Sequence, residues 1–508
     1  MNEEIEEYYE ELYRLYIDEN QPLERRYRQL RESLERVVRE KIQGNSLQTT
    51  DLAARINYVA TQYGLDLKEQ NQLHTFRLTS NDILNHRKSP VKEEFLRDLR
   101  AVAYAYRKMF AQDIPLKLFS VLPKQEIASS GKKEKMEYIR RIRVCFDYAD
   151  DTYLYVHPVD VIADELIRVV YNKPGINHEF EETIKELWRY AQLNLLDVSV
   201  DRDGIYTPSF IVLEPDYLID ISSLAECYKD YGSHPANYFL SRLVPIDNAR
   251  PLLLGNIANL FLDEWIHAGE EEPDYIDCMK KAFRQYPIEL AACAELRDPS
   301  KEKEFAKDCR MHFEHIRDVV QHTFLEPGYN LDKKEAVLEP SYICEALGIQ
   351  GRLDYMQRDM SSFIEMKSGK ADEFSIQGKV EPKENNKVQM LLYMAVLEYS
   401  MGHDRRRMHP YLLYTRYPLL YPARASWAQV RRVINLRNRI VAAEYGVQFH
   451  NHPDFTRNLL AQINPEVVNE RKLSGRFWEQ YLKPSISRFR EKLSALEPLE
   501  QAYFYTLY

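Results

Sequence analysis

Helical spacing of apolar residues dominates several long stretches of the chain. In residues 1–45 an apolar stripe begins at Leu12 and Tyr16, and the stretch 23–42 contains neither Gly nor Pro. The same spacing recurs farther along, in residues 93–109, 176–193, 250–325, 386–401, 425–445 and 474–494. These patterns predict a mostly helical first domain and a helical end of the chain.

Strand-like patterns stand between the helical ones. Apolar or alternating runs within 117–160 predict a small β unit. The run Phe210–Leu213 predicts a short buried strand, and the segment 335–370 switches to strands. Tyr411–Tyr414 predicts one more strand, after the helix at 386–401.

Two polar clusters have the composition of helix starts. Thr49-Thr50-Asp51 precedes a helical run that ends at Gly64, so it predicts a capped helix over 52–63. Ser80-Asn81-Asp82 predicts the start of another helix. The helix over 52–63 admits a second interpretation, as part of a helix-turn-helix, but capped helices occur in every class of protein.

Composition narrows the class of protein. The 508 residues are 44% hydrophobic and 29% charged, as in ordinary globular proteins, and the length suggests about three domains. The net charge of −10 argues against a protein that coats nucleic acid, although a nuclease needs only a local basic surface. The six cysteines are scattered, no apolar run reaches the roughly 20 residues of a membrane span, and the acidic N-terminus lacks a signal-peptide core. We expect a cytoplasmic protein with reduced thiols and no membrane partner.

Local basic clusters and abundant tyrosine leave a nucleic-acid surface open. The clusters are Lys132, Lys133, Lys135, Arg140, Arg141 and Arg143, then Arg405–Arg407, then Arg431, Arg432, Arg437 and Arg439. Each is either a solvated face or a patch for phosphates. The 36 tyrosines either offer stacking surfaces for single-stranded bases or fill cores and interfaces.

The residues with the strongest chemical signal lie close together in sequence. Asp354 ends one apolar run, and Glu365 and Lys367 lie in the next, beyond a turn within 356–361. If the two runs pair as strands, Glu365 and Lys367 share one face, because alternate strand residues point the same way. Two carboxylates are typical ligands of Mg²⁺, and Lys367 is placed to orient a water or to neutralise charge at a phosphate. The Met366 carbonyl is a further candidate metal ligand.

A predicted helix follows these strands. Gln389 and Tyr393 are four residues apart, so one helical face carries both and is placed to hold the lysine, a water or a DNA phosphate. Arg352, Lys370 and Lys387 are candidate contacts to the DNA backbone. This set of groups suits metal-dependent hydrolysis of a phosphodiester. The alternative, surface charges on a hairpin, leaves the order Asp, Glu-x-Lys, Gln-x-x-x-Tyr unexplained.

This order of motifs resembles the PD-(D/E)XK nuclease superfamily in its RecB-type branch, and in particular the nuclease domains of eukaryotic nuclease–helicases that trim Okazaki flaps. The resemblance covers about 208–420 of the chain. Within it, Phe210–Cys227 is similar to the family's first segment, Leu347–Asp354 to its metal-binding strand and Pro410–Tyr414 to its last core strand. The resemblance implies a central mixed sheet flanked by helices, and a deoxyribonuclease that depends on Mg²⁺ or Mn²⁺.

Two departures from the family pattern bear on the metal and on a cofactor. The segment Gly255–Asn259 stands where the family has Gly-x-x-x-His, so Asn259 is a candidate ligand but a weaker one than imidazole for Mn²⁺. Many family members hold a four-cysteine iron–sulfur cluster. Cys227 matches one of its ligands, but no cysteine follows Cys344. We therefore expect no iron–sulfur cluster, and a metal held mainly by Asp354 and Glu365.

Other candidate residues leave their alternatives open. Glu339 lies where some family members place a further acid, and is equally well an ordinary surface residue. His312, His315 and His322 fall near one face of a helical segment, which admits a metal site, but no carboxylate motif accompanies them. The chain contains neither a P-loop nor a Gly-x-Ser-x-Gly elbow.

Together these features predict an α/β protein of four parts. They are a helical N-terminal domain (1–116), a small β-containing domain with helices (117–200), a PD-(D/E)XK nuclease domain (201–424) and a helical C-terminal segment (425–508). The expected activity is metal-dependent hydrolysis of single-stranded or flap DNA, in replication, repair or phage defence. The resemblance implies coupling to a helicase, either as a partner or as a C-terminal continuation. The alternative is a catalytically weak DNA-binding scaffold, for which Asn259 is the support.

Overall fold

The computed structural model describes residues 3–42, 51–123, 137–159, 166–243, 250–329, 331–374, 379–424, 426–450 and 452–507. It is a mixed α/β protein with a helical N-terminal region, mixed sheets and a helical C-terminal segment. The chain forms two compact units: the first comprises Met1–Glu214 and Glu444–His450, the second Pro215–Ala443 and Asn451–Tyr508. The expected boundaries near 116 and 200 fall inside the first unit, and the one near 424 falls inside the second.

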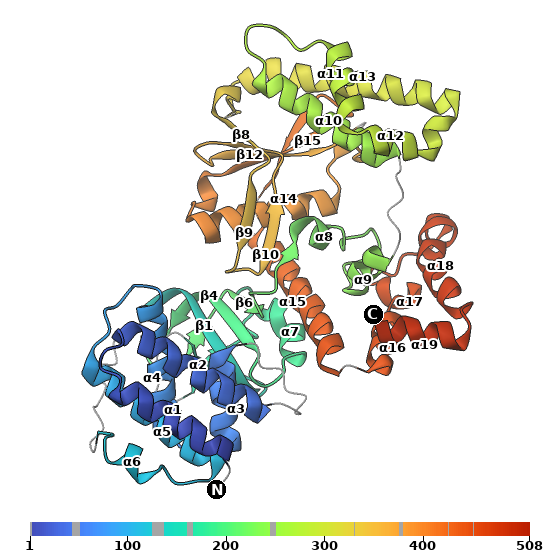
Figure 1. The fold of residues 1–508 in the computed structure, drawn as a ribbon. Helices are drawn as coiled ribbons and strands as arrows, with labels where there is room; N and C mark the ends of the chain where they lie inside the picture. The colour runs from blue at the N-terminus through green and yellow to red at the C-terminus, as the bar shows by residue number, and fades with distance from the viewer. Residues whose placement is uncertain are drawn as a thin grey trace. The chain divides into compact units, whose positions relative to one another are not determined.

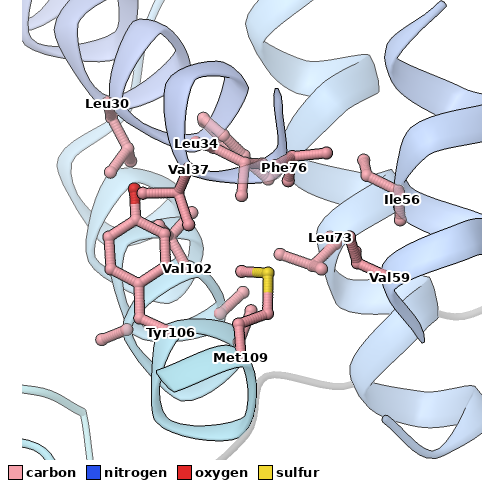
Figure 2. Close-up of a cluster of buried hydrophobic side chains, with 14 of the residues drawn as sticks. Leu30, Leu34, Val37, Ile56, Val59, Leu73, Phe76, Val102, Tyr106 and Met109 are labelled. Atoms are coloured by element: carbon pink, nitrogen blue, oxygen red, sulfur yellow. The ribbon is translucent and has the colours of Figure 1, made fainter. Parts of the chain in front are cut away.

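Helices form the first part of the first unit (Figure 1). They are α1 (Glu3–Ile17), α2 (Leu23–Ile42), α3 (Leu52–Gln62), α4 (Leu67–Leu84), α5 (Lys92–Phe110) and α6 (Leu116–Phe119). The helix expected over 1–45 is interrupted before α2, where Pro22 lies at a helix start that proline tolerates better than a helix interior. The apolar faces of these helices meet in one core, in which Leu34, Phe76 and Tyr106 are fully buried (Figure 2).

The start predicted for α3 is confirmed at Asp51. The Asp51 side chain accepts a hydrogen bond from the Ala54 N–H at 2.8 Å, which satisfies a helix donor that has no partner within the helix. Thr49 and Thr50 lie outside the described residues, as do the lysines of the basic cluster at 132–135.

The helix start predicted at Ser80–Asp82 is wrong. These residues lie inside α4, which begins after Asp66, and Asp66 and Glu69 cap that helix reciprocally. Ser80 is buried, and its hydroxyl donates to the Arg77 carbonyl at 2.9 Å. A serine that bonds back to its own helix is tolerated in the interior, so its residue type alone does not mark a helix start.

A small five-stranded barrel follows the helices in the first unit. Its strands, with one extension, are β1 (Glu137–Ala149), β2 (Tyr153–Pro158), β3 (Ile167–Val170), β4 (Gln192–Val200), β5 (Tyr206–Thr207) and β6 (Phe210–Leu213). They pair in the order β1-β2-β3-β5-β4, and β1 also pairs with β4, which closes the ring, while β6 extends from β4. The β3–β5 pair is parallel and the other pairs are antiparallel.

The helix predicted over 176–193 is wrong at its C-terminal end. The turn η1 (His178–Phe180) and α7 (Glu181–Lys185) are helical, but β4 begins at Gln192. Every residue from 190 to 196 is buried, so this part of the strand shows no apolar–polar alternation. Cys145, Val159 and Tyr190 pack into the core of the N-terminal helices, so helices and barrel share one core.

Three sheets organise the second unit. Its strands are β7 (Ile219–Asp220), β8 (Ala336–Leu338), β9 (Ser341–Cys344), β10 (Ile349–Arg352), β11 (Tyr355–Gln357), β12 (Ser362–Lys367), β13 (Asp372–Phe374), β14 (Lys379–Glu381), β15 (His409–Tyr414) and β16 (Leu419–Pro422). The largest sheet has the order β16-β15-β12-β11-β8 and is mixed, because β12 runs parallel to β15. The other two sheets are β7-β10-β9 and β13-β14. The predicted strand pair is confirmed, since Tyr355 pairs with Ile364 and Met356 with Phe363.

The helices that follow the first unit's barrel are α8 (Ile221–Ala225), α9 (Ala236–Leu243), α10 (Arg250–His267), α11 (Tyr275–Gln285), α12 (Pro287–Ala292), α13 (Pro299–Gln321), α14 (Glu384–Met401), α15 (Trp427–His450), α16 (Pro453–Ala461), α17 (Pro465–Val468), α18 (Lys483–Ser494) and α19 (Pro498–Leu507). They belong to the second unit, except for the end of α15, residues 444–450, which belongs to the first. Shorter helical turns lie at Ala294–Arg297, Thr323–Leu325, Lys333–Glu335, Arg405–Arg407 and Trp478–Leu482. Figure 1 shows α10 and α13 on one side of the five-stranded sheet and α14 on the other. Within the described ranges, no helix combines the length and the apolar character that crossing a bilayer requires.

Candidate active site

The β11–β12 hairpin places the two predicted carboxylates beside each other. Asp354 directly precedes β11, and its Oδ2 accepts a hydrogen bond from the Met366 N–H at 2.6 Å. In β12, the side chains of Ile364 and Met366 belong to the apolar core that includes α10 and α13. Strand alternation therefore turns Glu365 to the opposite face of the sheet, toward α14.

Glu365 is the centre of a hydrogen-bond network. Its Oε1 accepts from the Lys367 Nζ at 2.9 Å and from the Gln389 Nε2 at 2.6 Å. The Lys367 Nζ donates a second bond to the Gln389 Oε1 at 2.8 Å, so the three side chains close a ring. Gln389 also donates to the Ser222 hydroxyl of α8 at 3.2 Å. Side chains of β12 and α14 thereby hold one carboxylate oxygen, and α8 holds the Gln389 amide that bonds it.

The second oxygen of Glu365 is buried and has no partner. Its Oε2 forms no hydrogen bond within the part of the chain that the structure describes, and the residue is only 4% exposed. Burial and the nearby Asp354 charge raise the pKa of Glu365 to about 8, although Lys367 opposes the shift. Burial also raises the pKa of Asp354. A buried carboxylate with an unsatisfied oxygen is costly unless a proton or a cation binds it, so the geometry suits a cation at this point.

The lysine of the network is held as a cation. Burial by itself would lower the pKa of Lys367, but the adjacent Glu365 carboxylate raises it. Two of its three N–H donors go to Glu365 and Gln389, which leaves the third for a ligand. Its side chain keeps 27% of its exposure, so part of the side chain is open to solvent.

Tyr393 forms a hydrogen bond to the backbone just before Asp354. Its hydroxyl donates to the Arg352 carbonyl oxygen at 2.6 Å, and burial raises its pKa, which keeps the hydroxyl protonated. A Cβ at Gly351 would lie 3.1 Å from that hydroxyl, so glycine permits the close approach. Gln389 and Tyr393 come from one face of α14, as their spacing predicts, but they hold different groups.

The three basic residues predicted to contact DNA lie in separate settings. The Arg352 guanidinium pairs with Glu339 at 3.2 Å. The Lys387 ammonium pairs with Glu381 at 3.7 Å. Lys370 is exposed, three residues beyond β12. In the described ranges none of the three forms an ion pair with Asp354 or Glu365, so any role in binding DNA stays a prediction.

Asn259 lies in α10, one turn beyond Gly255. Gly255 approaches the end of β12 closely, because an added Cβ would lie 3.3 Å from the Ser368 hydroxyl. Asn259 is half-buried, and within the described residues no hydrogen bond joins it to Asp354 or Glu365. The structure therefore brings this helix next to the end of β12 without including Asn259 in the network.

Two further residues near the site were missed in the sequence. Ser222 bonds Gln389 across 167 residues of sequence, and no local pattern marks such a pairing. Asp263 lies four residues after Asn259 in α10, and burial with the charges of Glu339 and Asp354 raises its pKa to about 6. Helical spacing from Asn259 was the available signal for Asp263. Glu339 is held beside the site, since its N–H donates to the Asp354 carbonyl at 3.1 Å.

The remaining candidates do not belong to the hydrogen-bond network of Glu365. His312 is buried, which lowers its pKa to about 4, and the His315 Nδ1 lies 3.0 Å from the Thr415 carbonyl oxygen. Cys227 is a buried free thiol whose pKa burial raises to about 12. Among the described residues no three His, Cys, Asp or Glu side chains form a group that would hold a metal.

For Arg437, both interpretations of the basic clusters are wrong. It is neither on a solvated face nor on a phosphate patch, because it is fully buried in the second unit. Its Nε donates to the Gly348 carbonyl at 3.2 Å, and its Nη2 donates to the Tyr217 carbonyl. Gly348 has φ +64° and lies against the guanidinium, so the arginine fixes the turn that precedes β10.

The donor atoms at Asp354 and Glu365 fit a hard cation. They are the unpartnered Glu365 Oε2 and the second oxygen of Asp354, with the Met366 carbonyl as a further candidate. Mg²⁺ commonly binds through one or two carboxylates and keeps several waters, so two carboxylates suffice for it. A structural Zn²⁺ site needs four protein ligands of a softer kind, and these residues do not supply them. Neither the protein-family models nor the curated proteins contain a match to this chain.

Proposed function

We propose that this chain is a deoxyribonuclease of the PD-(D/E)XK type that depends on Mg²⁺ or Mn²⁺ and hydrolyses single-stranded or flap DNA. One observation carries the proposal: Glu365 is buried beside Asp354 with one oxygen held by Lys367 and Gln389 and the other without a partner. A surface hairpin has no physical reason to bury a carboxylate in this way, because its ionised form is destabilised there. A cation-binding site has such a reason, because the bound cation stabilises the ionised carboxylate.

Each residue of the network has a distinct role in this proposal. Asp354 and Glu365 would hold the metal, which when bound polarises a phosphate oxygen and lowers the pKa of a water. Lys367 offers its remaining N–H donor to the attacking water or to a phosphate oxygen. Gln389 positions Glu365 and Lys367, and Tyr393 positions the strand end before Asp354.

A cleavage assay tests the proposal directly. Labelled single-stranded, flap and duplex DNA are incubated with the protein in Mg²⁺, in Mn²⁺ and in EDTA. We expect cleavage that needs metal, and a loss of about a hundredfold or more in Glu365→Ala and Lys367→Ala. Glu466→Ala and Lys492→Ala, far along the chain from this network, are the matched controls and should cleave like the wild type.

Two results of this assay would count against the proposal. If the wild-type protein cleaves DNA with neither metal, the assignment as an enzyme is wrong. If cleavage survives both substitutions in β12, the protein is an enzyme but its active site lies elsewhere.

A second candidate function is a DNA-binding scaffold with little activity. The observation in its favour is that Asn259 stands outside the hydrogen-bond network at the position where the family has a histidine ligand. Binding of single-stranded DNA without cleavage in any metal would support it. For the nuclease, coupling to a helicase is part of the proposal, and a helicase that increases cleavage of flap DNA would support that part.

A further inference from the structure

The barrel of the first unit carries a row of aromatic and basic side chains on its outer surface. Tyr148 in β1 pairs with Tyr155 in β2, and Tyr155 pairs with Arg168 in β3. Directly paired residues share a face of a sheet, so the three side chains lie in one row across three strands. Leu154 and Val156, the neighbours of Tyr155 in sequence, are fully buried on the other face of β2, inside the barrel.

The rings in this row are arranged as a platform. The Tyr148 and Tyr155 rings stack with their centroids 4.3 Å apart and their planes 13° from parallel, and Tyr148 is 50% exposed. Tyr153, on the same face of β2, meets Tyr155 edge-on at 6.4 Å. The Arg168 guanidinium lies 5.8 Å from the centroid of the Tyr153 ring. The surface therefore offers flat ring faces together with one cation.

Hydrogen bonds hold the platform in place before any ligand binds. The Tyr155 hydroxyl donates to the Asp150 Oδ2 at 3.0 Å, and the Asp150 Oδ1 accepts from the Tyr153 N–H at 2.7 Å. The Arg168 Nη2 donates to the Asp203 carbonyl at 3.2 Å. Side chains that are already ordered lose little conformational entropy when a ligand stacks on them.

The N-terminal helices cover a neighbouring part of the barrel and stop short of this row. Cys145 belongs to the core shared with the helices, and it pairs with His157 across β1 and β2. His157 is two residues from Tyr155, on the same face of β2. The covered surface thus ends one pair before the row, and Tyr148 remains exposed.

We propose that the row of Tyr148, Tyr155 and Arg168, with Tyr153 beside it, binds single-stranded nucleic acid by base stacking. A five-stranded barrel is a common scaffold for oligonucleotides, which lie across its second and third strands. Any base has a flat face that can stack on tyrosine, so the row needs no particular sequence. Asp150 lies beside the rings and repels phosphate, so affinity depends on stacking more than on charge. The inference stands without the proposed nuclease, because none of these residues belongs to that site.

Binding in EDTA, where metal-dependent cleavage is absent, tests the inference with the full chain. Fluorescence anisotropy is measured with labelled oligo(dT), oligo(rU), a DNA duplex and an oligosaccharide. We expect both single strands to bind, and Tyr148→Ala and Tyr155→Ala each to weaken oligo(dT) binding by about fivefold or more. Tyr148→Phe keeps the ring and should bind like the wild type. Arg168→Ala should make the slope of log binding constant against log salt concentration shallower by about 0.7. Tyr503→Ala, an exposed tyrosine of α19, is the control and should have no effect.

Three outcomes would overturn the inference. One is that both alanine variants bind oligo(dT) as tightly as the wild type. Another is that the oligosaccharide binds in a Tyr148-dependent way and nucleic acid does not. If circular dichroism shows that an alanine variant fails to fold, Tyr148→Trp replaces it, since a tryptophan in contact with bases changes its fluorescence emission. The third outcome is that the emission of Tyr148→Trp responds to oligo(dT) no more than the emission of the wild type.

Discussion

The Tyr393 hydroxyl donates to the Arg352 carbonyl oxygen at 2.6 Å, and the preceding residue is Gly351, where an added Cβ would lie 3.1 Å from the same hydroxyl. This contact joins α14 to the end of β10, two residues before Asp354. The position of the first carboxylate therefore depends on a glycine with no chemistry of its own. A contact this close has consequences for stability that do not depend on any assignment of function.

Gly351→Ala should destabilise the second unit by about 1–3 kcal/mol, because the Tyr393 hydroxyl and the Ile221 side chain must both move. Urea unfolding gives the free energy of unfolding. Gly269→Ala is the matched control, since a Cβ there meets open space, and it should change that free energy by less than about 0.5 kcal/mol.

A double-mutant cycle sharpens this prediction. Tyr393→Phe alone should cost about 1 kcal/mol through the lost hydrogen bond. Adding it to Gly351→Ala relieves part of the clash, so the double variant should be more stable than the sum of the two costs implies. Strict additivity would show that the hydroxyl and the glycine are not coupled.

The raised pKa of Glu365 predicts a pH-dependent stability in the absence of metal. Its ordinary pKa is 4.5 and its folded-state pKa is about 8, so between these values the folded state binds a proton that the unfolded state does not. The free energy of unfolding should therefore fall as pH rises through this window, and the loss should be complete above about pH 8. Urea unfolding in EDTA across the window measures it.

Glu365→Gln is the control for the pH prediction, because its amide does not titrate. Its stability should lack the part of the pH dependence that Glu365 contributes. Mg²⁺ should restore stability to the wild type at the alkaline end of the window, since the ion binds the carboxylate only in the folded state. Identical pH profiles for the two proteins would mean that Glu365 keeps an ordinary pKa.

Local patterns predicted the parts of the site that depend on local geometry. The hairpin that carries Asp354 and Glu365 follows from two apolar runs separated by a turn, and the shared face of Gln389 and Tyr393 follows from helical spacing. The partners of these side chains did not follow in the same way. Ser222 reaches Gln389 only because α8 packs against α14, and that packing is a property of the whole fold.

For buried segments, the sequence prediction is wrong for a different reason. In β4, Leu193 and Asn194 are both fully buried although they point to opposite faces, so the strand shows no alternation. Residue type predicts an exposed Arg437, because arginine is seldom buried. Its carbonyl partners on Gly348 and Tyr217 come from distant segments, which no local pattern reveals. In both cases tertiary packing overrides what residue type suggests.

Under the proposed nuclease function, Gln389 should be essential to the rate of cleavage and not only to the fold. Gln389→Ala removes a donor to Glu365 and an acceptor for Lys367, and hydrogen bonds to charged groups are worth about 1.5–3 kcal/mol, which corresponds to roughly ten- to a hundredfold in kcat. Steady-state cleavage of single-stranded DNA in Mg²⁺ measures this loss. Ser222→Ala removes only a neutral bond of 3.2 Å to the same amide and should lose much less. Equal losses in the two variants would contradict the central place of Gln389.

Under the proposed nuclease function, Asn259→His should raise the cleavage rate supported by Mn²⁺ more than the cleavage rate supported by Mg²⁺. Imidazole is a better ligand than an amide for Mn²⁺, whereas Mg²⁺ prefers oxygen and gains little from nitrogen. The prediction requires that residue 259 reaches the metal past the end of β12, where the approach of Gly255 to Ser368 one turn earlier places α10. Single-turnover cleavage with each metal gives the ratio of the two rates. Asn259→Gln is the control, because it keeps an amide and should leave that ratio unchanged. A histidine variant with the wild-type ratio would show that position 259 lies outside the reach of the metal.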